Sequence, residues 1–507
     1  MKTWLLSRAS NSQYSTISPT DTHSPQQPPA RKTSNARLYL AVFTVTLGNF
    51  SFGYSIVYSS PALKQLNETS NPRLHLDDTN KSWFASSYTL GAAFGGFMAI
   101  LLNNCLGRKT IILVSIVPCV AGFALMAAAQ AIWMLDFGRT LTGIAGGISV
   151  ASIPMYVSEI STVEVRGKLG AGAQIMTVIG SFLLYLLDLR LSWRWLAGLG
   201  LIAPVVMFVL LLFMPESPRY LISANQNEKA IRALVWLRGP DADCRREFAD
   251  IRDAARENMK RVSCADLKQP GIYKPVLMVV IMWALQQLSG ITVILLYMEL
   301  IFSQTQVVLV SSHQTRYTAR DRRYILLSLR LRFCPQSGNA DSPIVGVVRL
   351  LAVLVTSWLL DRTGRRKLLF ASGQAMDNVT VTCLAGPQVT PAGLTLIPLL
   401  SIIIMVFGYS LGWGPITWLM TSELLPIRVR GQVSGLCVLF SWILSFLIAN
   451  QFLAAQHHLG CSVPFFFFAA ISLLSLVFTA LFIPETMGLT LEEIEEYFQP
   501  ISTTRQA

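Results

Sequence analysis

Charged side chains are scarce in this sequence of 507 residues. Asp, Glu, Lys and Arg make up 14% of the chain, whereas apolar residues make up 52%. A soluble globular domain carries roughly 25% charged residues, so an ordinary soluble protein is excluded. The composition predicts an all-α, polytopic membrane protein. At about 20 residues per helical crossing, the chain can supply about a dozen spans and still leave tails and one sizeable loop.

Other absences exclude further classes. The eight cysteines form no Cys-x-x-Cys pair. Several fall in or beside apolar runs, so we interpret them as small core residues rather than as a disulfide framework or metal site: Cys105, Cys119, Cys383 and Cys437. The chain shows no nucleophile–base set and no cluster of metal ligands, so neither enzymatic activity nor a cofactor is expected.

The formal net charge of +13 has a different origin from that of a nucleic-acid-binding protein. The basic residues cluster in short loops between apolar runs, where they orient a membrane protein. No nucleic-acid partner is expected. Residues 1–37 are rich in Ser, Thr, Pro and Gln and lack an apolar core segment, which predicts a disordered cytoplasmic tail rather than a signal peptide.

Hydropathy divides the rest of the chain into two membrane parts and a linker. A first bundle of six spans is predicted at 38–214, a cytoplasmic linker with two amphipathic helices at 215–272, a second bundle at 273–483 and a cytoplasmic tail at 484–507. The spans are expected near 38–58, 83–102, 111–129, 132–156, 169–187, 195–214, 276–302, 343–360, 394–412, 433–452 and 463–482.

The stretch Val276–Phe302 carries two adjacent amides, Gln286 and Gln287, at the centre of a span, with Gly290 one turn later. An amide at this depth needs a partner inside the protein or on a ligand. We interpret the stretch as the wall of a polar cavity between helices. The alternative is that both amides only bond to a neighbouring helix.

The two halves of the chain repeat each other. Gly107-Arg108-Lys109 returns as Gly364-Arg365-Arg366, 257 positions later (107 to 364). Glu159 followed by Val165-Arg166-Gly167 returns as Glu423 followed by Val429-Arg430-Gly431, and Pro215-Glu216-Ser217 returns as Pro484-Glu485-Thr486. Three motif pairs in the same order indicate a duplicated six-helix unit in one orientation, whose shared interface lies at mid-membrane.

Loop composition predicts the orientation. Asn67-Glu68-Thr69 is an acceptor triplet for N-glycosylation, which requires the first long loop to face the lumen or the exterior. The next loop, Gly107-Arg108-Lys109, is short and basic and is therefore expected in the cytoplasm. Both termini are then cytoplasmic.

These motifs resemble those of the sugar-porter branch of the major facilitator superfamily, and within it the facilitative hexose transporters of class III. The resemblance covers about 38–498 and rests on specific elements: PESPRYL at 215–221, QQLSG at 286–290, GWGPITW at 412–418 and PETMGLTLEEIEEYF at 484–498. It implies a fold of two six-helix bundles and passive transport of hexoses, such as glucose, by alternating access.

The resemblance also implies a sugar site. Gln174, Gln286 and Gln287 match amides that bond sugar hydroxyls, and neutral amides suit a neutral polyol because they donate and accept. Trp418 matches an aromatic residue that packs on the sugar ring. Thr292 stands where the family motif usually has Asn, and Ser441 and Ser445 also replace Asn of better-studied relatives. Fewer amides predict a weaker or differently tuned site.

A set of charged residues matches the cytoplasmic ion-pair clusters that latch the outward-open state in this family. The alternative is that they are topology signals and surface pairs of little energy. They are Arg108, Glu159, Arg166, Asp361, Arg365, Glu423 and Arg430. Arg349 lies inside the eighth span, where many relatives have Asn, and a membrane-embedded cation should face the cavity or pair with an acid or a carbonyl.

Two regions depart from the family. The loop at 303–342 should be short and external, yet it holds six arginines. The ninth span, expected within 367–393, is interrupted by Asp377 and Asn378, and without it the tenth span would enter the membrane from the wrong side. The sequence therefore suggests a mispredicted gene model or splice variant at these two places.

Proton-driven sugar porters carry a carboxylate in the first span near a fourth-span arginine. Here Ser55 and Arg139 occupy these positions, and the first span has no Asp or Glu, which favours uniport. A proton symporter with an acid elsewhere, a non-transporting sugar sensor and a defective splice isoform stay open. Leu5-Leu6 resembles a dileucine sorting signal, although Lys2 precedes it; it implies a sorting adaptor as partner and an endosomal or lysosomal membrane, with the plasma membrane as the alternative.

Overall fold

The computed structural model describes residues 36–68, 73–162, 165–239, 244–257, 269–312, 341–377, 397–426, 429–460, 462–488 and 491–498. Within these ranges the regular structure is helical and contains no strand. The all-α prediction is confirmed. The tail residues Leu5 and Leu6 lie outside the described residues, as do most of the two departing regions, 313–340 and 378–396.

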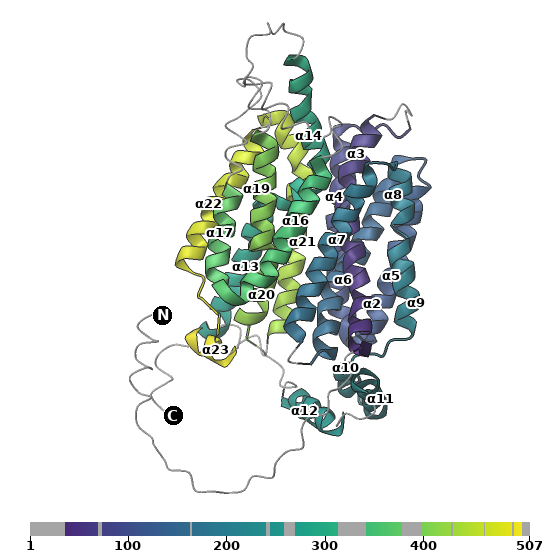
Figure 1. Ribbon diagram of the computed structural model, residues 1–507, viewed down its shortest axis with the longest axis vertical. Coiled ribbons are helices and arrows are strands. Elements are labelled where there is room, and N and C mark those ends of the chain that lie inside the picture. Colours follow the sequence, from purple (N-terminus) through teal and green to yellow (C-terminus); the bar gives the residue numbers. More distant parts are fainter. Residues whose placement is uncertain are drawn as a thin grey trace.

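Two helix bundles stand side by side (Figure 1). The first is built from eight helices, of which two pairs form one broken span each: α2 (Ala36–Val57) with α3 (Ser59–Asn67), α4 (Asp78–Leu106), α5 (Arg108–Ala127), α6 (Ile132–Ile160), α7 (Arg166–Asp188), and α8 (Trp193–Leu199) with α9 (Ile202–Leu212).

The second bundle repeats this plan with its own broken spans. Its helices are α13 (Pro270–Leu288) with α14 (Ile291–Ser312), α16 (Asp341–Thr363), α17 (Arg365–Asp377), α19 (Ile397–Leu411) with α20 (Trp413–Leu424), α21 (Arg430–Leu459) and α22 (Val463–Leu481). Eleven stretches of the described chain are long and apolar enough to cross a bilayer, and they coincide with the spans expected from hydropathy.

Short polar helices lie together at one end of the bundles: α10 (Pro218–Ser223), α11 (Asn227–Arg238), α12 (Cys244–Glu257) and α23 (Leu491–Phe498). The two amphipathic linker helices expected from the sequence are α11 and α12. We call this end the linker side, and the opposite end, where α3 and α14 lie in Figure 1, the far side.

Apolar side chains cover the outside of the bundles. Val117, Trp195, Phe213 and Leu481 are each at least two-thirds exposed. In water such a surface would promote aggregation, whereas in a bilayer it contacts acyl chains at no cost. Inside the first bundle, α4 and α6 touch through glycines, since a Cβ on Gly143 would lie 2.1 Å from the carbonyl oxygen of Tyr88. The fourth span thus packs closely through a face of small residues.

Of the ninth crossing, the structure describes one short helix. α17 has 13 residues and is about 20 Å long, which is less than the hydrocarbon thickness of about 30 Å, and it is not among the eleven stretches long enough to cross. It nevertheless begins on the linker side, where Arg365 bonds Glu485. Ser372 of α17 donates to the carbonyl oxygen of Gly408 on α19 at 2.6 Å, and α20 returns to Arg365 through Glu423. The tenth span therefore keeps the repeat's orientation, and the wrong-sided entry considered from the sequence does not arise.

Candidate functional site

The seventh span breaks at Gly290, between α13 and α14. Gly290 has φ +81°, which L-residues with a side chain rarely adopt. A Cβ there would lie 2.5 Å from the ring of Phe468 on α22. Both the backbone conformation and the lack of space therefore require glycine at this position. The helix is thus interrupted at Gly290, which frees backbone and amide groups in the middle of the second bundle.

The two glutamines before the break belong to one hydrogen-bonded network. Gln286 is 1% exposed, and its Nε2 donates to the carbonyl oxygen of Trp413 at 2.7 Å. Gln287 Nε2 approaches Gln286 Oε1 at 3.4 Å, and Thr292 Oγ1 donates to Gln287 Oε1 at 2.9 Å. These bonds use one amide hydrogen of each glutamine, so each has a second hydrogen for another acceptor.

These contacts agree in part with the alternative interpretation, in which the two amides only bond to a neighbouring helix. Gln286 does bond to a neighbouring helix, because Trp413 begins α20. The bond takes the amide's first donor and fixes its plane, which orients the remaining donor. Thr292 contributes its hydroxyl to the same network at the place where the family motif usually has Asn.

Aromatic rings border the network. Trp418 packs edge-on against Trp283, with ring centroids 4.7 Å apart and an angle of 87°. The indole of Trp283 donates to Thr421 Oγ1 at 3.0 Å, which holds the pair in place. Trp418 is half-buried, so part of its ring remains free to contact a ligand. The sequence singled out Trp418 as a candidate, whereas Trp283 has no motif of its own and was not predicted.

The other residues predicted for the sugar site make no described hydrogen bond to the amide network. Gln174 lies half-buried on α7 of the first bundle, and the described contacts include no hydrogen bond from it to the amides of α13. Ser441 and Ser445 are buried on α21. Ser441 bonds its own helix at Val438, while the hydroxyl of Ser445 finds no partner among the described residues.

Arg349 lies 7% exposed on α16. Its Nη1 approaches Ser181 Oγ of the first bundle at 3.5 Å. Tyr185 and Tyr409 are near enough to interact electrostatically with the guanidinium. In the described part of the chain no carboxylate lies within 4.0 Å of Arg349. The buried cation thus stands where the two bundles meet, among hydroxyl groups.

On the linker side of the first bundle, an ion pair joins α5 to α6. Arg108 approaches Glu159 Oε1 at 3.1 Å and donates to the carbonyl oxygen of Asn103 at 2.8 Å. Ser217 donates to the second oxygen of Glu159. Glu216 accepts from the backbone N–H of Lys109 at 2.9 Å and of Ser217 at 2.8 Å. Both carboxylates are therefore held by charge-assisted bonds.

The second bundle repeats the main contacts of this arrangement. Arg365 approaches Glu423 Oε1 at 3.2 Å, and Thr486 donates to Glu423 Oε2 at 2.6 Å. Glu485 accepts from the backbone N–H of Arg365 at 2.9 Å. The repeated motifs contain four further members of these clusters to which the sequence gave no role: Glu216, Ser217, Glu485 and Thr486.

Each ion pair lies inside its own bundle, and neither joins the two bundles. Among the described side chains, the partner of Glu159 is Arg108 and the partner of Glu423 is Arg365. The side chains of Arg166, Asp361 and Arg430 lie outside the described residues. The Arg108 and Arg365 guanidiniums thus tie helices together at the linker-side end of each bundle separately.

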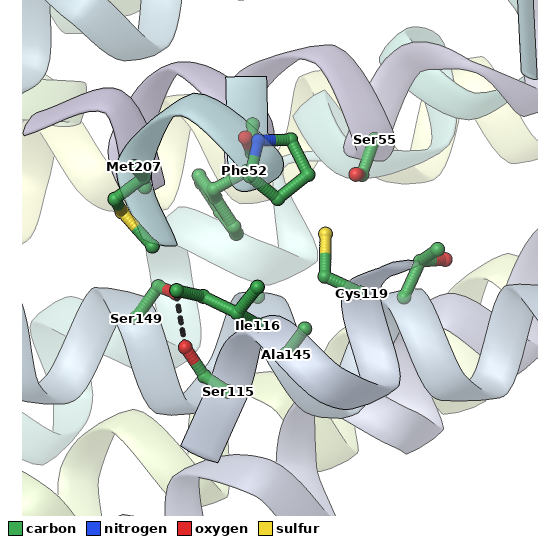
Figure 2. A pocket seen from close by; sticks show the side chains of 13 residues that line it. Phe52, Ser55, Ser115, Ile116, Cys119, Ala145, Ser149 and Met207 are labelled. Atoms are coloured by element: carbon green, nitrogen blue, oxygen red, sulfur yellow. Dashed lines mark hydrogen bonds between the residues drawn. The ribbon is translucent and has the colours of Figure 1, made fainter. Parts of the chain in front are cut away.

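A small cavity opens inside the first bundle between α2, α5, α6 and α9 (Figure 2). Hydroxyl and apolar groups line it, among them Ser55 and the pair Ser115 and Ser149, whose oxygens are 3.5 Å apart. None of its lining residues is acidic. Arg139 is fully buried and donates to the carbonyl oxygen of Ser55, one of the lining residues, at 2.5 Å.

Aromatic rings surround the guanidinium of Arg139. It stacks over Tyr88 at 4.7 Å from the centroid, and Tyr58 and Phe84 lie near 6 Å. No carboxylate lies within salt-bridge distance of Arg139 among the described residues. The first-span position that faces this arginine therefore offers a carbonyl group rather than a titratable acid.

Two duplicated six-helix units, a polar break in the seventh span and matched ion-pair clusters at one end define a transporter of the major facilitator fold. The chain matches the family model described as "Sugar (and other) transporter" over residues 41–313 and 338–498. It belongs to that family of membrane transporters.

Individual relatives agree. The chain is 47% identical over 483 residues to mouse "Solute carrier family 2, facilitated glucose transporter member 6", covering 92% of each chain. It is 35% identical to mouse member 8 of that family, over 93% of this chain and 96% of the relative. The inward-open xylose transporter XylE of E. coli superposes with a TM-score of 0.71 at 21% identity, over 91% of this chain and 99% of XylE, which confirms the fold.

Proposed function

We propose that this protein carries hexose sugars such as glucose down their gradient by alternating access. The relatives named facilitated glucose transporters support this function. The observation that carries it is the amide network at the Gly290 break, where Gln286 and Gln287 keep donors for a neutral polyol beside the half-buried ring of Trp418.

Contacts between the bundles support the alternating-access part of the proposal. On the far side, Ser59 of α3 donates to the carbonyl oxygen of Leu296 on α14 at 3.1 Å. The backbone N–H of Glu299 donates to Ser60 Oγ at 3.0 Å. These bonds close the far side, so the state described has a sealed far-side gate that must open for sugar to enter from there.

Uniport is favoured over proton symport by the surroundings of Arg139. In a symporter of this family an acid would face this arginine, whereas here the carbonyl of Ser55 does so. The runner-up is a proton symporter that uses another acid. Sugar uptake by reconstituted protein, driven by a pH gradient without a sugar gradient, would establish the runner-up and reject uniport.

Orientation and location follow from the same proposal. The linker side, with its basic loops and both tails, is cytoplasmic. Asn67 lies exposed at the end of α3 on the far side, which suits a glycosylation acceptor facing the lumen or the exterior. The resident membrane is endosomal or lysosomal, with Leu5 and Leu6 as the signal read by a sorting adaptor, or the plasma membrane.

The site is tested by uptake of labelled glucose into liposomes that hold the purified chain. We expect saturable uptake, an increase in KM or a loss of uptake for Gln286→Ala, and normal uptake for Gln130→Ala. Gln130 is an exposed glutamine between α5 and α6 and serves as the matched control. Equal uptake by all three proteins would reject the amide site, and binding without uptake would identify a sugar sensor.

A further inference from the structure

The far-side gate contains two buried carboxyl groups that the sugar site does not use. Asp188, the last residue of α7, is 4% exposed, and Glu299 of α14 is 2% exposed. The first belongs to the first bundle and the second to the second bundle. They lie against each other, and their side chains are in hydrogen-bond contact.

Neighbouring groups complete the cluster. Gln65 Nε2 donates to Asp188 Oδ1 at 2.8 Å, Lys64 Nζ lies 3.7 Å from Glu299 Oε2, and Ser342 of α16 bonds the Glu299 side chain. Tyr185 interacts electrostatically with both carboxyls and with Arg349 behind them. The contacts thus join α3 and α7 of one bundle to α14 and α16 of the other.

Hydrogen-bond chemistry requires a proton in this contact. Ionised carboxylates only accept hydrogen bonds, so two of them cannot bond each other unless one carries a proton. In addition, Glu299 Oε1 is buried and meets no donor among the described residues. A proton on either carboxyl supplies the missing hydrogen bond between the two side chains.

Repulsion between like charges supports the same conclusion. With both carboxyls ionised, two negative charges would lie in contact in a site shielded from water, which is costly. One shared proton removes this repulsion. Opening the gate separates Asp188 from Glu299 and admits water, so each carboxyl can then ionise independently.

We propose that Asp188 and Glu299 form a proton-binding site that locks the far-side gate. One proton shared by the two carboxyls holds α14 against α3 and α7, and loss of the proton releases them. The closed gate binds more protons than the open gate, so acid favours closure and a rise in pH favours opening. This inference rests on the alternating-access function and adds control by pH on the far side.

Hydrogen exchange of backbone amides in lipid nanodiscs measures the gate without sugar. The reporters are peptides from α3 and α14, compared at about pH 5.5 and 7.5 after correction for intrinsic exchange. One proton changes an equilibrium by up to tenfold per pH unit, so the wild-type peptides should lose protection by more than tenfold as the pH rises.

Amide substitutions supply the decisive comparison. In Glu299→Gln or Asp188→Asn, the amide donates a permanent N–H to the remaining carboxylate, and protection should be high at both pH values. The control is Asp78→Asn, which removes an exposed carboxylate on the same side (68% exposed, paired with Lys81); it should keep the wild-type pH dependence.

Wild-type protection that does not change with pH, or a Glu299→Gln protein that still changes with pH, would overturn the proposal. A protection that follows Na⁺ rather than pH, tested by exchange against choline, would replace the proton with a metal cation and also overturn it. Because exchange does not depend on flux, absent glucose transport with an intact pH effect would refute only the proposed function.

Discussion

The two ends of the bundles are held together in different ways. On the linker side, each bundle has its own cluster, and the clusters match residue for residue, from Arg108 and Glu159 to Arg365 and Glu423. On the far side, the described closing contacts run between bundles, as with Lys64 and Glu299. The linker-side contacts thus follow the duplicated unit, whereas the far-side contacts belong to the place where the two units meet.

The largest effect is expected from the turns that carry the linker-side clusters. Gly107 and Gly364 have φ near +90°, and a Cβ at each would lie within 2.7 Å of a carboxylate oxygen, of Glu216 and Glu485 respectively. Gly107→Ala and Gly364→Ala should each destabilise the protein by about 3 kcal/mol, since backbone strain and a displaced carboxylate add up.

Thermal unfolding in detergent measures the destabilisation by these two substitutions, with Gly239→Ala as the control. Gly239 has φ +95° and nothing within 4 Å of the added Cβ, so only the strain remains, about 1 kcal/mol. If one of the two turns tolerated alanine as well as Gly239 does, the two clusters would not be equivalent.

A smaller effect is expected from the ion pairs themselves. Glu159→Gln and Glu423→Gln each remove the charge that Arg108 or Arg365 faces, while keeping the shape and one acceptor. Each should destabilise the linker-side end of its bundle by about 2 kcal/mol. Hydrogen exchange of α10 and α23 is the measurement. A large effect from only one of the two variants would show that the repeat has lost its symmetry in function.

On the far side, Ser60→Ala removes the hydroxyl that accepts from the backbone N–H of Glu299. Loss of one such bond costs about 1 kcal/mol, so the gate equilibrium should move about fivefold toward opening. Exchange of the α14 amides should rise by that factor while the linker-side amides stay unchanged. Ser223→Ala, an exposed serine on α10, is the control, and an equal rise there would contradict a local effect.

An effect as small as that of Ser60→Ala is expected at the central site. Thr292→Asn restores the amide usual at this position and can still donate to Gln287. One added hydrogen bond to sugar, worth about 1 kcal/mol, should lower the KM for glucose about fivefold without altering either gate. Glucose uptake at varied concentration measures this. A changed pH dependence or changed exchange at the gates would show that Thr292 acts on closure instead.

The linker side and the central site could be predicted from the sequence better than the far side. The repeated motifs predicted the two bundles and marked the charged residues of both linker-side clusters, because duplication leaves a pattern. The motifs gave no role to Glu216 and Ser217 or to their repeats. The adjacent Gln286 and Gln287 beside Gly290 indicated the polar break, because amides at mid-membrane depth need hydrogen-bond partners. The partners of Glu159 and Glu423 needed the fold, since several arginines stand close in sequence.

The far side left no comparable signal. Asp188 ends one span and Glu299 lies in another, and each alone is an ordinary polar residue near a membrane surface. Only the packing of α7 against α16, and of α3 against α14, brings them together. The absence of an acid beside Arg349 in the described chain was equally beyond prediction, because a cation's partner depends on which helix faces it.

The central claim is passive hexose transport, and counterflow of labelled glucose tests it most directly. Liposomes holding the wild-type chain are loaded with unlabelled glucose, with the same pH on both sides, and diluted into labelled glucose. The account predicts a transient accumulation of label above its outside concentration, which Gln286→Ala abolishes. No accumulation from correctly inserted protein, or accumulation only when a pH gradient is imposed, would contradict it.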